Sequence, residues 1–349
     1  MIVVYTITKN EEKFIKRWAD SSKDADLRVV VDTGSSDNTI QIAKECGCVV
    51  HQIQVNPWRF DVARNMALDL LPTEATWCIS LDADEILIDG WREEINKVKK
   101  DTTSLYYEYT WSFFPDGTPD RVFYTNKIHK RHLYRWKSPI HEILTPLSEE
   151  ISEYVNIQIH HHPDNTKSRG SYLPLLKMAS EEEPNNQRIL FYLAREYLFY
   201  NNISDCTKEC KRLLNLIEKD GKYISDVEIC HVYIYLYKCD GDYEWLLKAK
   251  IFTPNRREPL VELSWYYYHK KMWKECNDYA LSALNIRNKP KDYLTTNEYW
   301  KEIPWDLAAI SFWNLGKYVE ADAYGEKALS FNRNDERLKN NCELYKNKY

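Results

Sequence analysis

The sequence has no apolar run long enough to cross a membrane as a helix. A membrane helix needs about 18 or more consecutive apolar residues, and no segment of the 349 residues approaches that length. The first residues, MIVVYTITKNEEKFIKRW, place no basic segment ahead of their apolar run, which is also too short for a signal peptide. The sequence therefore predicts a cytoplasmic protein without a membrane span.

Cysteine occurs nine times but never in a CxxC pair, and no histidine cluster accompanies it at zinc-finger spacing. The closest pairs are Cys46 with Cys48 and Cys206 with Cys210. We therefore expect free thiols in a reducing compartment rather than a structural zinc site or a disulfide framework.

Glycine is also scarce, with only 9 residues. A Gly-rich phosphate-binding loop is absent near the N-terminus, where the sequence reads TITKNEE, and this argues against a nucleotidyltransferase. The net charge of −5 gives no whole-chain signal for nucleic acid or an anionic membrane. In contrast, 26 Tyr and 12 Trp offer aromatic surface for packing or for stacking on sugars and bases.

The first hundred residues alternate between strand and helix signals. Strands are expected in MIVVYTI, LRVVVD, CVVHQIQV and WCISLDADEIL. Helices are expected in NEEKFIKRWADSSK, with Asn10 as its N-cap, in SDNTIQIAKECG, closed by Gly47, and in DVARNMALDLLP. This alternation predicts an α/β domain with a largely parallel sheet. Ligands of such sheets bind at the carboxyl ends of the strands.

The pattern changes in the second part of the chain. Residues 102–162 are aromatic and β-prone, which predicts added strands or a lid, and from about residue 170 the sequence is helical. Four segments share two amphipathic halves: 186–218, 227–250, 259–288 and 305–335. Small residues recur where paired helices would touch, at Ala194, Ala280, Ala309, Ala321 and Ala328. This layout resembles the tetratricopeptide repeat.

A cluster of acids follows the fourth strand. Its apolar run ends in DADE, residues 82–85, with three carboxylates in four positions. Asp82 and Asp84 are two positions apart, so on an extended strand end they point the same way. Hard cations such as Mn²⁺ and Mg²⁺ prefer carboxylate oxygens. The segment is therefore either a cation site or a solvated turn.

Four motifs in this order resemble the nucleotide-binding half of family 2 glycosyltransferases, whose fold is called GT-A. They are TITKNEEKFIKRW, VVVDTGSSDNTIQIA, RFDVARNMALDL and WCISLDADEIL. The resemblance covers residues 1–100 closely and 101–170 more loosely. It implies an α/β nucleotide-binding GT-A, Rossmann-like domain over 1–168, followed by an all-α TPR-like domain over 169–349. The activity it implies is metal-dependent, inverting sugar transfer from a nucleotide-sugar, most often a UDP-sugar.

The resemblance also implies roles for individual residues. Asp84 would hold Mn²⁺ or Mg²⁺, and Asp82 would face the ribose or reach the metal through water. The donor-binding set that the resemblance implies comprises Thr6, Asn10, Glu11, Asp32, Arg64 and Asp82. Within it, Asp32 would accept a hydrogen bond from the base, and the backbone of Thr6 would contact it. For Arg64 the alternative is a structural ion pair with Asp61 or Asp32. Asp37 fits the structural role of a helix cap.

The remaining metal ligands and the general base lie in residues 102–162. By resemblance, His141 would ligate the metal or contact the diphosphate. Glu142 would act on the acceptor, with Asp116 and Glu85 as other candidates for the base. In IQIHHH, alternation places His160 and His162 on one face and His161 on the other. The expected ligand is His160 or His162, of which His160 is taken as the candidate.

A basic stretch, KIHKRHLYRWK, has five Lys or Arg and no acid. It is either a solvated strand face or a surface that attracts the diphosphate or an anionic acceptor. Aromatic side chains near it are candidates for stacking on a sugar: Trp111, Tyr134 and Trp136.

Two classes of function follow. The first is a glycosyltransferase that acts on a glycan or a protein, or on a modified DNA base, with a repeat domain that binds the acceptor or mediates homo-oligomer formation. The alternative is a repeat scaffold with a degenerate front domain. Because Asp32, Asp82 and Asp84 are all present, the sequence favours the enzyme.

Overall fold

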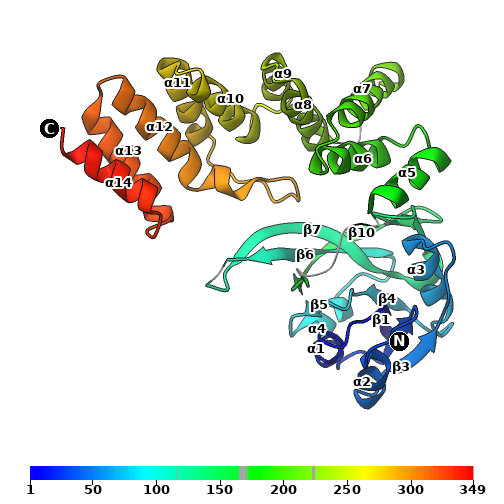
Figure 1. The fold of residues 1–349 in the computed structure, drawn as a ribbon. Helices are drawn as coiled ribbons and strands as arrows, with labels where there is room; N and C mark the ends of the chain where they lie inside the picture. The colour runs from blue at the N-terminus through cyan, green and yellow to red at the C-terminus, as the bar shows by residue number, and fades with distance from the viewer. Residues whose placement is uncertain (115, 165–169, 171, 222–224, 349) are drawn as a thin grey trace. The chain divides into compact units, whose positions relative to one another are not determined.

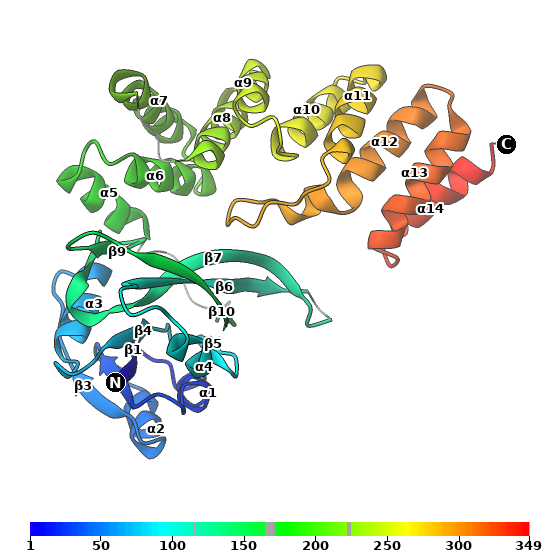
Figure 2. The same ribbon diagram turned by 180° about the vertical axis from the view of Figure 1, so that it is seen from behind.

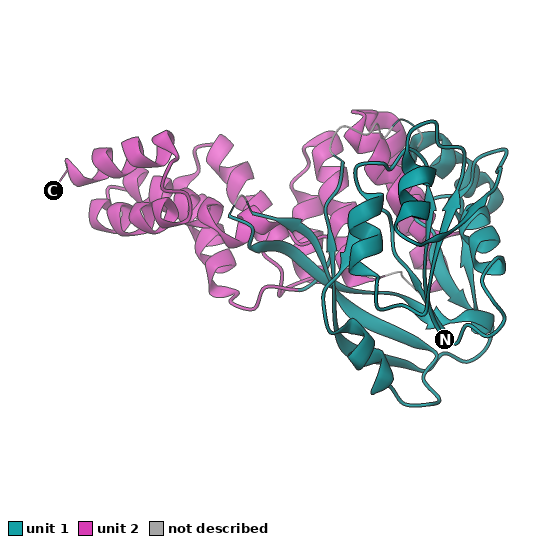
Figure 3. Ribbon diagram, turned by 90° about the horizontal axis from the view of Figure 1, so that it is seen from below, with its two compact units in different colours: residues 1–182, 291–293 teal, residues 183–290, 294–349 magenta. Residues whose placement is uncertain are grey.

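The structure is a computed structural model that describes residues 1–114, 116–164, 170, 172–221 and 225–348. It forms two compact units, Met1–Glu182 with Lys291–Tyr293, and Glu183–Pro290 with Leu294–Tyr349 (Figure 3). The domain boundary predicted at 168/169 lies outside the described residues.

The first unit is built on an eight-stranded mixed sheet in the order β3-β2-β1-β4-β7-β6-β10-β5 (Figure 1). Its strands are β1 Ile2–Thr8, β2 Leu27–Asp32, β3 Val49–Gln52, β4 Trp77–Ser80, β5 Glu85–Leu87, β6 Ser104–Phe113, β7 Pro119–Lys130 and β10 Ser152–His161. A two-stranded sheet pairs β8 Tyr134–Lys137 with β9 Ile143–Pro146. Helices of the unit are α1 Ile15–Ser21, α2 Thr39–Glu45, α3 Phe60–Asp69, α4 Trp91–Asn96 and α5 Tyr172–Glu182, with a 3-10 turn at Arg131–Leu133.

The predicted parallel α/β arrangement is confirmed for β1 to β4. β1 pairs in parallel with β2 and with β4, and β2 pairs in parallel with β3. Alternate residues of β1 enter different cores: Val3 lies with Ala67 of α3, whereas Val4 lies with Trp18 of α1. Both sheet faces are covered, which explains the continuous apolar run of β1.

The segment WCISLDADEIL is not one strand, as the sequence suggested, but two. β4 lies in the middle of the sheet and β5 at its edge, four strand positions away. Four spacings of a flat sheet measure about 19 Å, and the few residues that connect the two strands are folded into a turn closed by the Glu85 amide on the Asp82 carbonyl at 2.9 Å. The sheet therefore has to curl, which returns its far edge to the end of β4.

The first helix also begins later than the sequence predicted. Asn10 does not cap it, because α1 starts at Ile15 and Asn10 has a φ of 57°. The Asn10 amide donates to Ser35 Oγ at 2.9 Å, and its side-chain oxygen accepts the Ser36 amide at 2.8 Å. Contacts with the loop after β2 thus outweigh the local helix signal.

The second unit is helical in its described residues, as predicted. Its helices are α6 Gln187–Phe199, α7 Ile203–Asp220, α8 Asp226–Asp240, α9 Glu244–Phe252, α10 Glu258–His269, α11 Trp273–Asn285, α12 Glu302–Asn314, α13 Tyr318–Phe331 and α14 Glu336–Lys346, with a 3-10 turn at Asn297–Trp300. They follow one another as TPR-like antiparallel pairs (Figure 2). The five alanines predicted at helix contacts are fully buried. Gly316 separates α12 from α13 with a φ of 76°, which favours glycine.

No helix in the described part of the chain is both long and apolar enough to span a membrane.

His129 of β7 makes the stability of the first unit dependent on pH. Burial lowers the pKa of His129 from 6.5 to about 4. The unfolded chain therefore takes up this proton first as the pH falls, and about 3 kcal/mol of stability is lost between the two values. In His129→Gln this contribution is absent. We expect urea unfolding to show a smaller loss of stability for the variant than for the wild type between about pH 7.5 and about pH 5. Equal losses would contradict this.

Gly325 of α13 permits the close packing of α14 in the second unit. A Cβ at this position would lie 2.9 Å from two ring carbons of Tyr345. We expect Gly325→Ala to lower the free energy of unfolding by about 1 kcal/mol, because overpacking exceeds the gain in helix propensity. Thermal unfolding tests this. In a Tyr345→Leu background the same substitution should become neutral or stabilising, and a stabilising effect in the wild type would refute the clash.

Candidate active site

The acidic turn between β4 and β5 lies at the carboxyl edge of the parallel strands. The Asp82 amide donates to Glu85 Oε2 at 2.8 Å, and the Glu85 amide donates to the Asp82 carbonyl at 2.9 Å. These reciprocal bonds hold the turn and bring three carboxylates together. Each of them has different partners, so their chemical roles differ.

Asp82 is paired with two cations. One carboxylate oxygen accepts from Arg64 Nη2 at 2.7 Å and the other from Lys127 Nζ at 2.8 Å. Burial raises the pKa of Asp82, but Arg64 and Lys127 outweigh burial and hold that pKa well below its usual range. Asp82 is therefore ionised, and both of its oxygens are occupied.

Glu85 is buried and has a structural role in the turn. It is 1% exposed, and its Oε1 accepts from the Tyr109 hydroxyl at 2.6 Å and from Lys127 at 3.1 Å. Burial and the charge of Asp82 raise the pKa of Glu85. With its oxygens bonded inside the protein, Glu85 is unsuited to take a proton from an acceptor.

Arg64 of α3 ties the turn to two other segments. It donates to Ser80 Oγ at 2.9 Å and to Glu142 at 2.5 Å, in addition to Asp82. Its guanidinium also lies 4.9 Å from the ring centroid of Trp136. The ion pair considered with Asp61 or Asp32 does not form. Asp61 forms its ion pair with Arg59 instead, and the carboxylate of Asp32 accepts the Gly34 amide in the turn after β2.

Asp84 faces a histidine of β10, and that histidine is His161 rather than His160. Its carboxylate lies 3.4 Å from His161 Nε2, and its carbonyl accepts the His162 amide at 2.8 Å. Although burial opposes protonation, Asp84 raises the pKa of His161 above its usual value.

The register of β10 on β5 explains this difference from the expectation. β10 places His161 opposite Glu85 and His160 opposite Ile86. Successive side chains of a strand alternate between faces. The His160 ring accordingly lies 5.0 Å from Phe113. The predicted separation of His161 from its two neighbours is thus confirmed, and the imidazole beside Asp84 is that of His161, whereas the predicted ligand His160 lies on the other face.

Four of the six residues predicted to bind the donor, Thr6, Asn10, Glu11 and Asp32, lie around the ends of β1 and β2. Thr6 is fully buried. Asp32 closes its own turn, since its carboxylate accepts from the amides of Gly34 and Ser35 at 3.0 Å each and from the Ser35 hydroxyl. The Glu11 amide donates to Thr39 Oγ1 at 2.7 Å. Together with the contacts of Asn10, these bonds join the loops after β1 and β2 into one rim.

Asp37 has the structural role that the sequence indicated. Its carboxylate accepts from the Thr39 amide at 3.0 Å and from the Glu12 amide at 3.2 Å. Burial raises the pKa of Asp37, but these hydrogen bonds and that of the Thr39 hydroxyl lower it overall. Asp37 thus stabilises the start of α2.

The loop between β8 and β9 brings Glu142 to the site through Arg64. His141 has a φ of 50°, and its ring contacts Tyr172 edge-on, with centroids 5.9 Å apart. Asp116 instead belongs to the β6–β7 connection, where it accepts from the Thr118 amide at 2.9 Å. Of the three candidate bases, Glu142 is the one whose side chain reaches Arg64 from a loop.

The basic stretch 127–137 is neither a solvated face nor an open basic surface. Lys127 reaches the acids, Arg131 donates to the Leu71 carbonyl at 2.9 Å, and Lys130 lies 4.0 Å above the Trp77 ring. Tyr134 and Trp136 are buried and cannot stack on a sugar. Trp111 is exposed, and its ring centroid lies 4.5 Å from that of His161.

Asp84 and His161 are the pair of side chains in the site with metal-ligand chemistry. Among the described residues, no group of three or more His, Cys, Asp or Glu is arranged to hold a metal ion. Asp84 and His161 do place a carboxylate oxygen beside an imidazole nitrogen. Such a pair fits a divalent cation that completes its coordination with water and phosphate oxygens.

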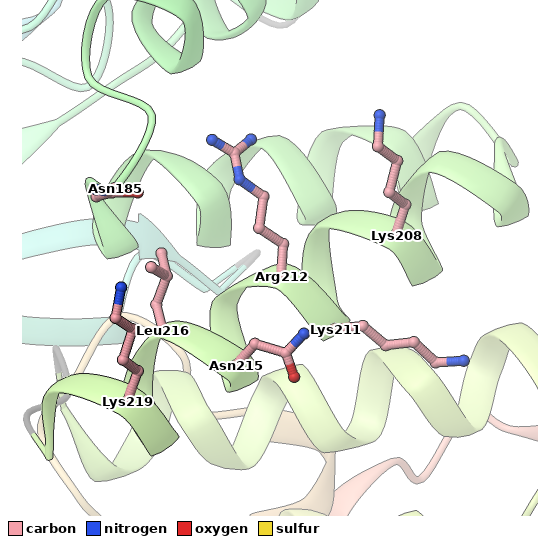
Figure 4. Close-up of a pocket in the computed structure, with 7 residues that line it drawn as sticks. All are labelled: Asn185, Lys208, Lys211, Arg212, Asn215, Leu216 and Lys219. Carbon is pink, nitrogen blue, oxygen red and sulfur yellow. The ribbon is translucent and has the colours of Figure 1, made fainter.

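A separate cavity of about 530 Å³ lies in the second unit (Figure 4). Its lining consists mainly of basic and amide side chains, namely Asn185, Lys208, Lys211, Arg212, Asn215, Leu216 and Lys219. Most of them project from one face of α7, at the spacing of successive helix turns. The charge of this lining suits anionic groups.

A curled mixed sheet with an acidic turn at its parallel carboxyl edge gives the first unit a GT-A-like fold. The particular family is given by residues 3–167, which match the model for glycosyl transferase family 2. This part of the chain is thus a family 2 glycosyltransferase domain.

Curated relatives match parts of the chain. An uncharacterized glycosyltransferase of Rickettsia typhi is 35% identical over 98 residues, which cover 28% of this chain and 32% of that protein. A TPR repeat-containing protein of Synechococcus elongatus is 35% identical over 146 residues, which cover 40% of this chain and 34% of that protein. The chain spans about a third of the length of the curated relatives it matches.

Solved structures of repeat proteins are also similar to part of the chain. A thermophilic TPR protein of Thermus thermophilus matches with 18% identity and a TM-score of 0.34. The match covers 50% of this chain and 89% of that protein's chain. The MamA protein matches with 14% identity and a TM-score of 0.37. The match covers 48% of this chain and 87% of that protein's chain.

Lys127 is expected to be essential for the stability of the acidic turn. Lys127→Met would leave Asp82 and Glu85 without their shared cation, so we expect a loss of about 3 kcal/mol in urea unfolding. Adding Glu85→Gln should restore part of this loss, because it removes the buried charge that Lys127 had paired, whereas Asp82 keeps Arg64. The exposed Lys137→Met serves as the control. Unchanged stability of Lys127→Met would show that the pairs contribute nothing.

Proposed function

We propose that the protein transfers a sugar from a nucleotide-sugar, preferably a UDP-sugar, to an acceptor with inversion at the anomeric carbon. The observation that carries this proposal is the placement of Asp84 beside His161 at the carboxyl edge of a family 2 glycosyltransferase domain. Parallel sheets bind ligands at this edge, and the rim formed by the loops after β1 and β2 offers a place for the nucleotide.

The reaction exchanges one bond at the anomeric carbon for another. The bond from this carbon to the diphosphate oxygen breaks, and its electron pair stays on the oxygen. An acceptor atom forms the new bond from the opposite face, and its proton passes to a general base. Negative charge grows on the leaving diphosphate, so cations that lie close to it accelerate the step.

Asp84 and His161 are the residues that would hold a divalent cation. The mixed oxygen and nitrogen set favours Mn²⁺ over Mg²⁺, since imidazole suits transition metals better. Asp82 has both oxygens bonded to Arg64 and Lys127, which leaves it the role of orienting the turn or accepting from the ribose. When bound, the cation would neutralise charge on the leaving diphosphate.

Glu142 is the proposed general base. It lies on the β8–β9 loop, is held by Arg64 at 2.5 Å and remains partly accessible, with 12% of its side chain exposed. The contact with Arg64 fixes the position of the carboxylate. A base of this kind has to lie within hydrogen-bond reach of the acceptor atom.

The repeat unit is proposed to bind the acceptor. A glycan or protein acceptor is preferred over a modified DNA base, since the basic stretch 127–137 is engaged with the protein itself. The basic cavity on α7 favours an acceptor that carries negative charge. Self-association through the repeats is the other role proposed for this unit.

The metal site can be tested with two histidine variants that differ by one position. We expect thermal unfolding of the full chain to show stabilisation by a UDP-sugar that depends on Mn²⁺. Asp84→Asn and His161→Gln should lose this stabilisation, whereas His160→Gln should retain it. Release of UDP from the donor should fall by about a hundredfold or more in Asp84→Asn.

Two results would overturn this proposal. Failure of every nucleotide-sugar to stabilise the wild type, with or without Mn²⁺, would favour the non-catalytic scaffold. A response of Asp84→Asn equal to that of the wild type would exclude Asp84 as a metal ligand while leaving nucleotide binding in place.

A further inference from the structure

Helix α1 is fastened to both sides of the acidic turn. The Trp18 indole donates to the carbonyl of Leu81, the residue before Asp82, at 3.0 Å. The amide of Leu87, at the end of β5, donates to Ser21 Oγ at 3.3 Å. These bonds seat the middle of α1 against the turn (Figure 1), and Arg17 lies in this part of the helix.

The guanidinium of Arg17 has hydrogen-bonding capacity that the protein does not use. Within the described residues, neither Nε nor Nη2 has a hydrogen-bond partner, although both atoms are buried. The guanidinium lies 5.4 Å from the ring centroid of Phe14. Buried donors without a partner are rare and costly in folded proteins. An acceptor from outside the chain would remove this cost.

The surroundings of Arg17 belong to the acidic site. Burial lowers the pKa of Arg17, and the charge of Asp84 opposes that effect. Burial and the charge of Arg17 both lower the pKa of His162, the residue after His161. Within the described residues no ion pair joins Arg17 to Asp84, whose recorded ion pair is with His161. Arg17 is thus within electrostatic range of Asp84, on a helix that is hydrogen-bonded to both sides of the turn, without forming an ion pair with it.

The two other cations of the site are already engaged. Arg64 donates to Ser80, Asp82 and Glu142, and Lys127 donates to Asp82 and Glu85. Arg17 differs from both because its Nε and Nη2 donate to no acceptor within the described residues. A guanidinium presents its donors as a planar fork, a geometry that matches the oxygens of a phosphate group.

We propose that Arg17 binds the diphosphate of the donor at Asp84 and stabilises it as the leaving group. This inference rests on the proposed function, since it assigns the anion to a nucleotide-sugar. The diphosphate would then have two kinds of contact, one through a cation at Asp84 and His161 and one with the guanidinium of Arg17 on α1. The second kind of contact does not require a metal ion.

The experiment measures binding of UDP, uridine and inorganic pyrophosphate to the full chain by calorimetry, both with Mn²⁺ and with a chelator. We expect Arg17→Met to bind UDP and pyrophosphate about tenfold or more weakly, because charge-assisted hydrogen bonds are lost. Uridine, which has no phosphate, should bind both proteins alike. Arg17→Lys should retain part of the affinity.

Lys16→Met is the matched control. Lys16 is the preceding residue of α1 and pairs with Asp20 at 2.6 Å on the exposed side of the helix. The control should bind all three ligands as the wild type does. A loss in the control equal to that in Arg17→Met would assign the effect to general charge and overturn the proposal.

Stability of the ligand-free protein separates binding from a structural role. Removal of a guanidinium without hydrogen-bond partners should not lower the unfolding temperature of Arg17→Met. A structural role predicts a lower unfolding temperature together with weaker binding of uridine, and this combination would refute the proposal.

The outcomes also distinguish this proposal from the proposed function. UDP binding that is equal in the wild type and Arg17→Met would overturn the role of Arg17 and leave the glycosyltransferase intact. Pyrophosphate binding that depends on Arg17, without any nucleotide binding, would support the anion site and overturn the nucleotide-sugar. Absence of binding to the wild type would overturn both.

Discussion

The connection from β4 to β5 is the constraint on which the first unit depends. A few residues in a tight turn carry the chain from the middle of the sheet to its edge, so the sheet has to curl. β10 pairs with β5 at that edge, and its end brings His161 to within 3.4 Å of Asp84 in the turn after β4. Because the connection is also the acidic turn, the residues that force the fold are those that make the site.

Three neighbouring carboxylates acquire different roles from their partners alone. Asp82 and Glu85 are bonded to Arg64, Lys127 and Tyr109, which makes them the frame of the site. Asp84 pairs with His161 and stays partly exposed. Buried ion pairs contribute little net stability compared with apolar packing, but the loss of one partner is costly. Such a frame fixes the position of Asp84 more than it strengthens the fold.

Local patterns predicted most of the fold, and long-range pairing decided what they missed. Alternation and helical periodicity located β1 to β4 and the helix pairs, because each signal is contained in a few neighbouring residues. The loop at Asn10 was not predicted, because its hydrogen-bond partners Ser35 and Ser36 lie in the loop after β2, distant in sequence. Lys127 was one of five cations in its stretch, and only the pairing of β7 with β4 selects it. The separate face of His161 was readable, but the register that brings it to Asp84 was not.

The formal charges of the site give a reason for a metal requirement. Asp82, Asp84, Glu85 and Glu142 supply four negative charges, and Arg17, Arg64 and Lys127 supply three positive ones, which leaves one negative charge when His161 is neutral. A diphosphate that enters alone makes this imbalance larger by two charges, in surroundings where water screens poorly. A divalent cation that enters with the diphosphate leaves the balance unchanged. Arg17 lowers the repulsion but cannot remove it, so nucleotide binding should be weak without metal rather than absent.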